Sequence, residues 1–489
     1  RRQRQMCIRD SSSTSNQTPQ ASSSSGTVFP ARPHGQSAFE TPLNGGPQTP
    51  GRSDDALAGE NTPNGSPPAD STAAPRLVEE SDIYKVDGDT MYVLNRYRGL
   101  QIIDLSNLDE PRIIGRAPIY GWPKDMYVRD NKAYVIVSDY YSFWRGEDAL
   151  ADDTSWHANY GSQLRIVDIS NKQSPAVVGA INLQGDCGDS RIVGDVLYLV
   201  SHRYPWWGGW ATDDTQDLTQ VLSVDISDTD NVQLVDTVDF PRNGWEHHIH
   251  VNSNTIFLAA TAYNGWTENN TFHDGYTTTI QYVDISDPHG DIRLRGTAEV
   301  PGRVQDRWAL DEFNGFLRIA SGQTWGNGDV YLNTVDARNP DALTRSGSYT
   351  LHVDETLQSA RFDGERGYLV SFRQVDPLFT FDLSDPAHPV LLGELVMPGW
   401  LDFMVPMGNR VVALGHDETT DSNGNTSWGL SVSLIDVEQD TPVLLSRVNL
   451  DGAWGWVPSE RDDFATVSYT HLRAHETKAN VVCRLLLEK

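Results

Sequence analysis

One short motif recurs seven times along the chain and constrains its fold more than any other feature. Each copy is an apolar run that ends in aspartate, followed by a short polar turn and a second apolar run. A repeat of this kind is one supersecondary unit, which buries its apolar face against its neighbours. The chain is therefore predicted to fold as an array of similar units. The motif aspartates lie 46 to 64 residues apart, at Asp104, Asp168, Asp225, Asp284, Asp336, Asp382 and Asp436.

Each unit is predicted to hold four short strands, named a, b, c and d in chain order. In the second unit the pattern places them at 125–129, 132–138, 163–169 and 176–182. Tight turns join a to b and c to d, as is typical of antiparallel hairpins. Seven such four-stranded repeats predict an all-β fold, a β-propeller, over residues 76–467. Residues 454–467 resemble the start of an eighth, truncated unit.

The motif aspartate itself has a structural explanation. It stands where strand c meets the turn, and Ser or another short polar residue follows two positions later in most copies. A carboxylate at this position accepts a hydrogen bond from the backbone of its own turn. We therefore expect the seven aspartates to hold turns rather than to bind a ligand.

The two ends of the chain differ from the repeat array. Residues 11–75 are mostly Ser, Thr, Pro, Gly, Asn, Gln and Ala, which predicts a disordered tether. Residues 1–10 and 468–489 resemble translated sequencing-adapter sequence, and segments of foreign origin are excluded from fold reasoning. Because the chain starts at Arg1, we expect it to be a fragment whose upstream signal or lipid-attachment cysteine is missing.

Composition excludes several classes of protein. The formal net charge is −29, so the chain has no electrostatic basis for binding nucleic acid. Three cysteines are too few for a disulfide framework. No run of about 18 apolar residues suggests a transmembrane segment. Cys187 has Asp186 and Asp189 beside it, and these negative charges are expected to raise the thiol pKa, which argues against a nucleophilic role.

Segments 78–89, 415–424 and 429–437, in this order, carry a resemblance to a known family. Over residues 77–467 the chain resembles the bacterial secreted β-propeller proteins, whose propeller is distantly related to WD40 repeats. The resemblance implies an exported or envelope-associated propeller, located outside the cell or in the envelope. It carries no catalytic residues to transfer to this sequence.

Tryptophan is concentrated in one kind of connection. Of 14 tryptophans, 13 map to b–c loops or to the segments that lead into strand a, and only Trp308 is predicted to lie within a strand. In an up-and-down sheet these connections share one end. Indole rings suit a binding surface, although they also fill gaps between propeller blades. The candidate ligand-binding residues are Trp122, Trp144, Trp206, Trp207, Trp210, Trp245, Trp266, Trp325 and Trp400.

Acidic residues and histidines near the start of strand a form a second candidate site. When the units are aligned on their a–b turns, Asp125, Asp189, His248, Asp306, Ser359 and Asp402 are predicted to lie near equivalent positions, and Asp82 to start the ring. Such a ring of carboxylates is suited to Ca²⁺, whereas His248 and His250, on one side of a strand, favour Zn²⁺. The structural alternative is that these groups bond to backbone at the blade ends. The loop 416–425 resembles a calcium loop only in composition.

These observations favour an exported or cell-envelope β-propeller that binds a glycan, a peptide or an envelope protein through its tryptophan-rich face. Membrane tethering would require the missing N-terminal anchor. The alternative is a metal-dependent hydrolase or lyase with its site at the channel mouth, around the histidines and the aspartate ring. A third interpretation is a purely structural scaffold without a small-molecule ligand.

Overall fold

The computed structural model describes most of the repeat array. The predicted tether, both chain ends and the start of the eighth unit lie outside the described residues. No helix in the described part of the chain is long and apolar enough to span a membrane. The described residues are 76–79, 83–119, 121–138, 161–183, 185–203, 218–241, 246–263, 275–323, 328–353, 355–372, 376–397, 399–420 and 426–450.

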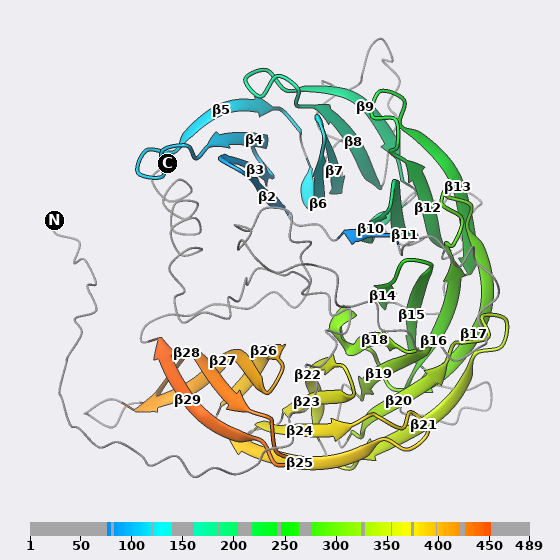
Figure 1. Cartoon of the computed structure of the whole chain (residues 1–489), viewed down its shortest axis with the longest axis vertical. Helices are drawn as coiled ribbons and strands as arrows, with labels where there is room; N and C mark the ends of the chain where they lie inside the picture. Colours follow the sequence, from blue (N-terminus) through cyan, green and yellow to red (C-terminus); the bar gives the residue numbers. More distant parts are fainter. Residues whose placement is uncertain are drawn as a thin grey trace, which may run out of the picture. The chain divides into compact units, whose positions relative to one another are not determined.

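Seven antiparallel sheets form within these residues, and the strand order in each follows the chain (Figure 1). The first three sheets are β2 (Tyr84–Asp87), β3 (Thr90–Asn95), β4 (Gly99–Asp104) and β5 (Arg112–Ala117); β6 (Trp122–Arg129), β7 (Lys132–Ser138), β8 (Ser162–Asp168) and β9 (Ala176–Asn182); and β10 (Asp186–Val193), β11 (Val196–Arg203), β12 (Leu218–Asp225) and β13 (Gln233–Pro241). A short strand β1 (Val78–Glu79) adds to β10 of the third sheet.

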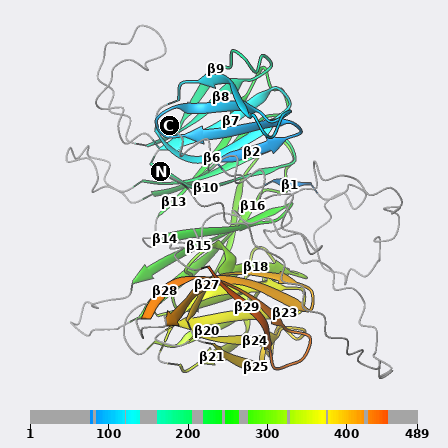
Figure 2. The ribbon, with the colours of Figure 1, turned by 90° about the vertical axis from the view of Figure 1, so that its left-hand side faces the viewer.

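The remaining four sheets repeat the pattern, and their strands lie side by side in both views (Figures 1 and 2). They are β14 (Glu246–Val251), β15 (Thr255–Tyr263), β16 (Tyr276–Asp284) and β17 (Arg293–Pro301); β18 (Leu310–Phe313), β19 (Phe316–Gly322), β20 (Val330–Asp336) and β21 (Thr344–Leu351); β22 (Thr356–Asp363), β23 (Arg366–Phe372), β24 (Asp376–Asp382) and β25 (Val390–Met397); and β26 (Trp400–Met407), β27 (Arg410–Thr420), β28 (Thr426–Asp436) and β29 (Val443–Leu450).

The predicted all-β propeller fold and the four-strand repeat are confirmed. In the second sheet three of the four predicted strands are within one residue of the observed bounds, and the first starts earlier, at Trp122. Two details are wrong. Trp308 lies in a 3-10 helix, η2 (Arg307–Ala309). Residues 416–420 of the predicted loop 416–425 are strand, because β27 runs to Thr420 and pairs with β28 there.

The motif aspartates hold their turns as predicted. Strand c of every sheet ends on one of them, and in each case Oδ1 accepts a hydrogen bond from the backbone N–H two residues later, over 2.8–3.1 Å. The N–H between them donates to a carbonyl of the a–b turn in the same sheet, as from Ile169 to Asn131 over 2.9 Å. Each copy thus joins the two turns of its sheet at one end, which we name the turn face.

Apolar clusters connect each sheet to the next along the chain. Tyr134 and Leu164 of the second sheet, for example, share a cluster with Leu197 and Leu222 of the third. All four side chains are buried. Ala133, next to Tyr134 in β7, belongs instead to the cluster shared with the first sheet. β7 thus contributes apolar groups to both sides of its sheet, as the stacked blades of a propeller require.

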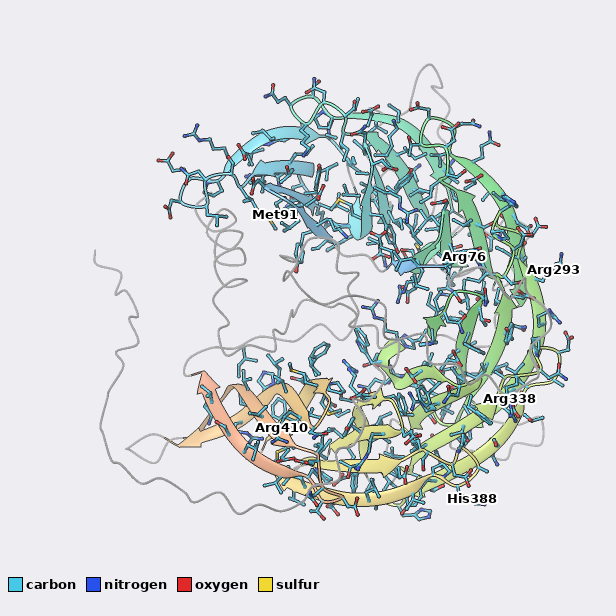
Figure 3. The ribbon with its side chains drawn as sticks, viewed as in Figure 1. Arg76, Met91, Arg293, Arg338, His388 and Arg410 are labelled. Carbon is cyan, nitrogen blue, oxygen red and sulfur yellow. The ribbon has the colours of Figure 1, made fainter. Side chains whose placement is uncertain are left out.

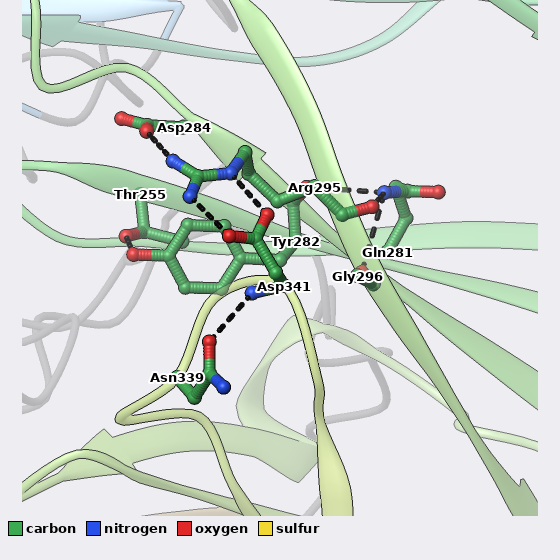
Figure 4. A network of polar contacts seen from close by, with 8 residues as sticks. All are labelled: Thr255, Gln281, Tyr282, Asp284, Arg295, Gly296, Asn339 and Asp341. Carbon is green, nitrogen blue, oxygen red and sulfur yellow. Dashed lines mark hydrogen bonds and ion pairs between the residues drawn. The ribbon is translucent and has the colours of Figure 1, made fainter.

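Polar contacts at the turn face lock neighbouring sheets together (Figure 4). Arg295 of β17 binds Asp284 of its own sheet at 2.7 Å and reaches Asp341, in the c–d turn of the next sheet, with two 2.7 Å bonds. Beside it, the Gly296 N–H donates to the Pro340 carbonyl over 2.7 Å. Because Gly296 has no side chain, the two backbones meet directly.

The first described segment is bound to the third and fourth sheets. β1 pairs with the end of β10, and the Arg76 guanidinium donates to the carbonyls of Ser253, Ile285 and Asp287 in the fourth sheet. Figure 3 shows Arg76 on the inner side of the sheets, whereas Arg338 and His388 of two c–d turns lie on the outer rim. The chain therefore meets the sheets at their turn face before it forms the first sheet.

Candidate functional site

The end of the sheets opposite the turn face carries the candidate residues. Here strand a of each sheet begins and strands b and c are connected, and we name it the strand-start face. Trp122 and Trp400 are the first residues of β6 and β26, so both lie at this face, at the start of the strands that they were predicted to precede. The other candidate tryptophans, with Asp82, lie outside the described residues: Trp144, Trp206, Trp207, Trp210, Trp245, Trp266 and Trp325.

Trp122 forms an exposed contact between the first two sheets. Its side chain is 44% exposed, and the Arg96 guanidinium carbon lies 3.4 Å from the centroid of its ring. Arg96 belongs to the short b–c turn of the first sheet, next to the strongly exposed Tyr97. The contact places a cation on an indole face at the surface of the molecule.

Trp400 lies in a more enclosed cluster. Its ring stacks on the His416 imidazole with centroids 4.7 Å apart, and His416 Nδ1 lies 3.0 Å from the Asp402 carboxylate. Gln358 of the preceding sheet donates to the other Asp402 oxygen over 3.1 Å. Burial raises the pKa of Asp402, while His416 and Gln358 oppose this shift. The cluster holds an imidazole in a fixed orientation beside a carboxylate.

Asp125 and Asp189 lie near a third group, centred on Asp186. Lys124 binds Asp186 at 3.0 Å, and the Ser138 hydroxyl donates to the same carboxylate over 2.7 Å. The Ser190 hydroxyl donates to Asp125 over 2.6 Å, and Arg191 binds Asp189. These carboxylates are therefore satisfied by protein groups from β6, β7 and β10.

Cys187 lies within this group and is fully buried in β10. Burial is the main cause that raises its thiol pKa far above the usual range, and the charges of Asp125 and Asp186 add to it. The upward direction of this pKa shift agrees with the prediction, although burial contributes more to the shift than the neighbouring charges do. Cys187 is thus unsuited to act as a thiolate nucleophile.

Asp306 caps a helix instead of starting a strand. Its carboxylate accepts hydrogen bonds from the backbone N–H groups of Trp308, over 2.9 Å, and Ala309, over 3.1 Å. Complete burial raises the pKa of Asp306, and the nearby charges of Arg361 and His248 lower it. Arg361 also covers the Trp308 ring at 4.5 Å. A buried charge and an aromatic group therefore lie between β14 and β22.

Asp306 and Asp402 depart from the register that Asp125, Asp189 and Ser359 share. Asp125, Asp189 and Ser359 each follow a β-bulge in strand a, and Phe403 occupies the same register in β26. Asp402 is the bulged residue itself, which directs it toward Gln358 and His416. Asp306 precedes β18 because the chain forms η2 there.

The candidate metal ligands do not converge in the described part of the chain. No three side chains of the His, Cys, Asp and Glu types come together there in a way that would hold an ion. His248 lies near Asp306, whereas His250 Nε2 accepts the Glu312 backbone N–H over 3.2 Å. His416 and Asp417 of the proposed calcium loop belong to β27. The described side chains thus match the structural alternative, in which they bond to protein groups at the blade ends, more closely than a single ring of metal-binding carboxylates.

Several residues of this face were not identified from the sequence. Arg96, Gln358 and Lys124 belong to no motif that the sequence analysis singled out, and their partners lie in neighbouring sheets. The same holds for His202 and His247, whose rings stack 4.0 Å apart across the third and fourth sheets. The adjacent Arg96 and Tyr97, in the short turn between β3 and β4, were the available signal for the first contact.

A family comparison places this geometry in context. The beta propeller domain model matches residues 75–212 and 209–470, which include all described strands. The chain belongs to the beta propeller domain family.

Two relatives of this propeller are archaeal, so similar chains are not confined to bacteria. An uncharacterised protein of Archaeoglobus fulgidus is 33% identical over 204 residues, which is 41% of this chain and 30% of that protein. An uncharacterised protein of Methanocaldococcus jannaschii is 31% identical over 187 residues, or 37% of this chain and 28% of that protein. The matched region spans less than a third of each relative.

Proposed function

We propose that this propeller is an exported or envelope-associated binding module that holds its ligand at the strand-start face. The ligand classes are those expected from the sequence: a glycan, a peptide or an envelope protein. Rigid β-sheets hold this face, and loops on a rigid scaffold are the usual place for recognition.

The observation that carries the proposal is the position of Trp122 and Trp400. These residues start the inner strands of two different sheets, and each ring contacts a polar partner, Arg96 or His416. Tryptophan and arginine dominate the binding energy of many interfaces because they combine large contact area with polar groups. Catalysis has less support, because the described carboxylates of this face are already bonded to protein groups.

Support for export comes from the sequence. Residues 11–75 have the composition of a solvated linker, and such a segment would give the propeller reach from an anchor. The resemblance to secreted propellers agrees with this location.

Arrays of defined oligosaccharides and peptides test the proposal. The wild-type chain is compared with Trp122→Ala, with Trp400→Ala, and with His388→Ala as the control, since His388 is an exposed residue of the turn face. We expect the tryptophan variants to lose about tenfold or more of the retention on any ligand that the wild type binds. Equal retention by all four proteins, or no retention of the wild type, would contradict the proposal and favour a scaffold.

A further inference from the structure

The seventh sheet has one side that packs on no other described sheet. Apolar clusters join each of the first six sheets to the sheet that comes next in the chain. We call the side of a sheet that packs on the next one its following side. No apolar cluster of the described residues contains members of both the seventh and the first sheet. The stack of described sheets therefore ends at the following side of the seventh sheet.

Strand pairing identifies the residues of a following side, and the second sheet provides the reference. Counted from the motif aspartate Asp168, Tyr134 pairs with Ile166 and Ile136 pairs with Leu164. These four side chains are at most 6% exposed, and they belong to the cluster that the second sheet shares with the third. Apolar residues at these positions are thus covered by the next sheet.

The seventh sheet carries apolar residues at the same positions. In the register set by its own motif aspartate, Val412 pairs with Leu434 and Leu414 pairs with Val432, which pairs in turn with Val448. Leu434 is 36% exposed and Val448 is 56% exposed. A group of apolar side chains that is exposed here and buried in an earlier sheet is typical of a contact surface.

The first sheet has a matching apolar side. Met91, Val93 and Ile103 are buried in a cluster whose described members all belong to the first sheet. Tyr92, between Met91 and Val93 in β3, belongs instead to the cluster shared with the second sheet. Because the blades of a propeller form a ring, a sheet between the seventh and the first would pack on both of these apolar sides.

The chain continues from β29 with a sequence that suits such a sheet. In the described sheets the next strand a follows strand d after a short connection, as from Met397 to Trp400. Residues 453–467 consist of two largely apolar runs around the polar run 459–463, which is the pattern of an a–b hairpin. The beta propeller domain model also extends over this segment, to residue 470.

A proline supports the assignment of the first run to strand a. Val457 and Pro458 are followed by a polar turn, as Val405 and Pro406 of β26 are. Proline has no N–H group to donate, so within a sheet it is confined to edge strands. Strand a is an edge strand, as β26 is in its own sheet.

We propose that the following side of the seventh sheet is the docking surface for residues 452–467 of the same chain, which pack on it as the inner hairpin of an eighth sheet. This segment is chosen as the occupant because it comes directly after β29 and because every earlier sheet takes the next part of the chain on the same side. The inference does not rest on the proposed function, so the two can fail separately.

Hydrogen–deuterium exchange of the whole chain tests the inference. In the wild type, peptides within residues 453–467 should exchange about tenfold more slowly, or slower still, than peptides within residues 11–75. Leu434→Asp places a carboxylate where the hairpin would bury it, and should speed exchange in residues 453–467 about tenfold or more. Val178→Asp is the control, since Val178 is an exposed apolar residue of β9, in a sheet whose two neighbours are both described.

Exchange of residues 453–467 in the wild type as fast as that of residues 11–75 would overturn the inference. Equal exchange rates of this segment in Leu434→Asp and Val178→Asp would also overturn it. Val448→Asp, at the more exposed position of the same side, provides a second variant if Leu434→Asp lowers the melting temperature.

Two further outcomes would assign the surface to another occupant. If Leu434→Asp speeds exchange in β3 and leaves residues 453–467 unchanged, the seventh sheet packs directly on the first. If sedimentation velocity shows a dimer that Leu434→Asp dissociates, while exchange in residues 453–467 stays the same, the occupant is a second copy of the chain. Either result would overturn the inference.

Discussion

At the scale of single residues, Asp168 shows how a motif aspartate acts. One carboxylate oxygen accepts the backbone N–H of Ser170 over 2.9 Å and its hydroxyl over 2.6 Å. The other binds the buried Lys132 ammonium at 3.1 Å. The hydrogen bonds from Ser170 are the largest cause that lowers the pKa of Asp168 to about 2, and Lys132 adds to it.

Asp168→Ala is predicted to destabilise the protein by roughly 2 kcal/mol, because charged hydrogen bonds are lost and Lys132 keeps only Asp230 as its carboxylate partner. Asp168→Asn should cost less, since its amide oxygen still accepts from Ser170. Urea denaturation measures both effects. Equal stability of Asp168→Ala and the wild type would show that the turn does not need the side chain.

The same carboxylate makes stability depend on pH. The pKa of Asp168 is lower in the folded state than the ordinary value near 3.9, so its stabilisation is complete above about pH 4 and is lost as pH falls toward about 2. Denaturation midpoints between these pH values should fall less steeply for Asp168→Asn than for the wild type. Identical slopes for the two proteins would contradict the lowered pKa of Asp168 in the folded state.

Breaking the buried pair of Asp402 and His416 should destabilise the protein more than breaking an exposed pair. Asp402→Ala removes the partner of a buried imidazole, and we expect a loss of about 2–4 kcal/mol. His388→Ala breaks the exposed pair with Asp385, leaves the bond from the Ala387 N–H to Asp385 in place, and should cost less than about 0.5 kcal/mol. Thermal melts of the two variants provide the comparison, and similar melting temperatures would refute the structural role of the buried pair.

The residues that were predicted correctly are those whose contacts are local. Each motif aspartate bonds to a residue two positions away, so its role is visible in the sequence. The partners of Asp402 and Arg96 lie 14 and 26 residues away in the chain. Asp402 is the bulged residue of β26, one position before the register that Asp125 holds after the corresponding bulge of β6. A bulge has no compositional signal, so the sequence does not show that Asp402 is the unpaired residue.

At the scale of elements, neighbouring sheets depend on close backbone contact. A Cβ atom on Gly296 would lie 2.8 Å from the Pro340 carbonyl oxygen, which belongs to the next sheet's turn. Gly296→Ala is therefore predicted to destabilise the protein by about 1–3 kcal/mol, as overpacking does. Gly275→Ala is the control, because its Cβ would have only the end of Gln323 nearby, at 3.8 Å. Equal melting temperatures of the two variants would contradict this account.

Elements with regular local patterns were also predictable. The strands of the second unit were identified because apolar runs alternate with tight turns. The long hairpin of β27 and β28 was missed because its outer residues are polar and resemble a loop. The pairing of β1 with β10 was missed because it joins residues more than 100 positions apart.

At the scale of the whole molecule, the segment around Arg76 fixes where the chain meets the propeller. Arg76→Ala removes the donor to three carbonyls of the fourth sheet, over separations of 177 to 211 residues. We expect limited proteolysis to cleave the variant on the N-terminal side of β2 about fivefold faster or more, because β1 alone makes few contacts. Arg112→Ala should be cleaved like the wild type. If Arg76→Ala is also unchanged, Arg76 does not hold this segment.

The two faces differ in their distance from the first described segment. Because residues 76–79 lie at the turn face, the candidate binding surface is at the opposite end of the sheets. Such an arrangement suits a tethered module, since a partner at the strand-start face does not compete with the segment that leads into the propeller.

Hydrogen–deuterium exchange with and without a ligand from the arrays tests the central claim most directly. Binding at the strand-start face predicts slower exchange in peptides that cover residues 94–99 and the starts of β6 and β26, with unchanged exchange in the c–d turns. Slower exchange confined to the c–d turns, residues 105–111 and 383–389 among them, would contradict the account and place the ligand at the turn face.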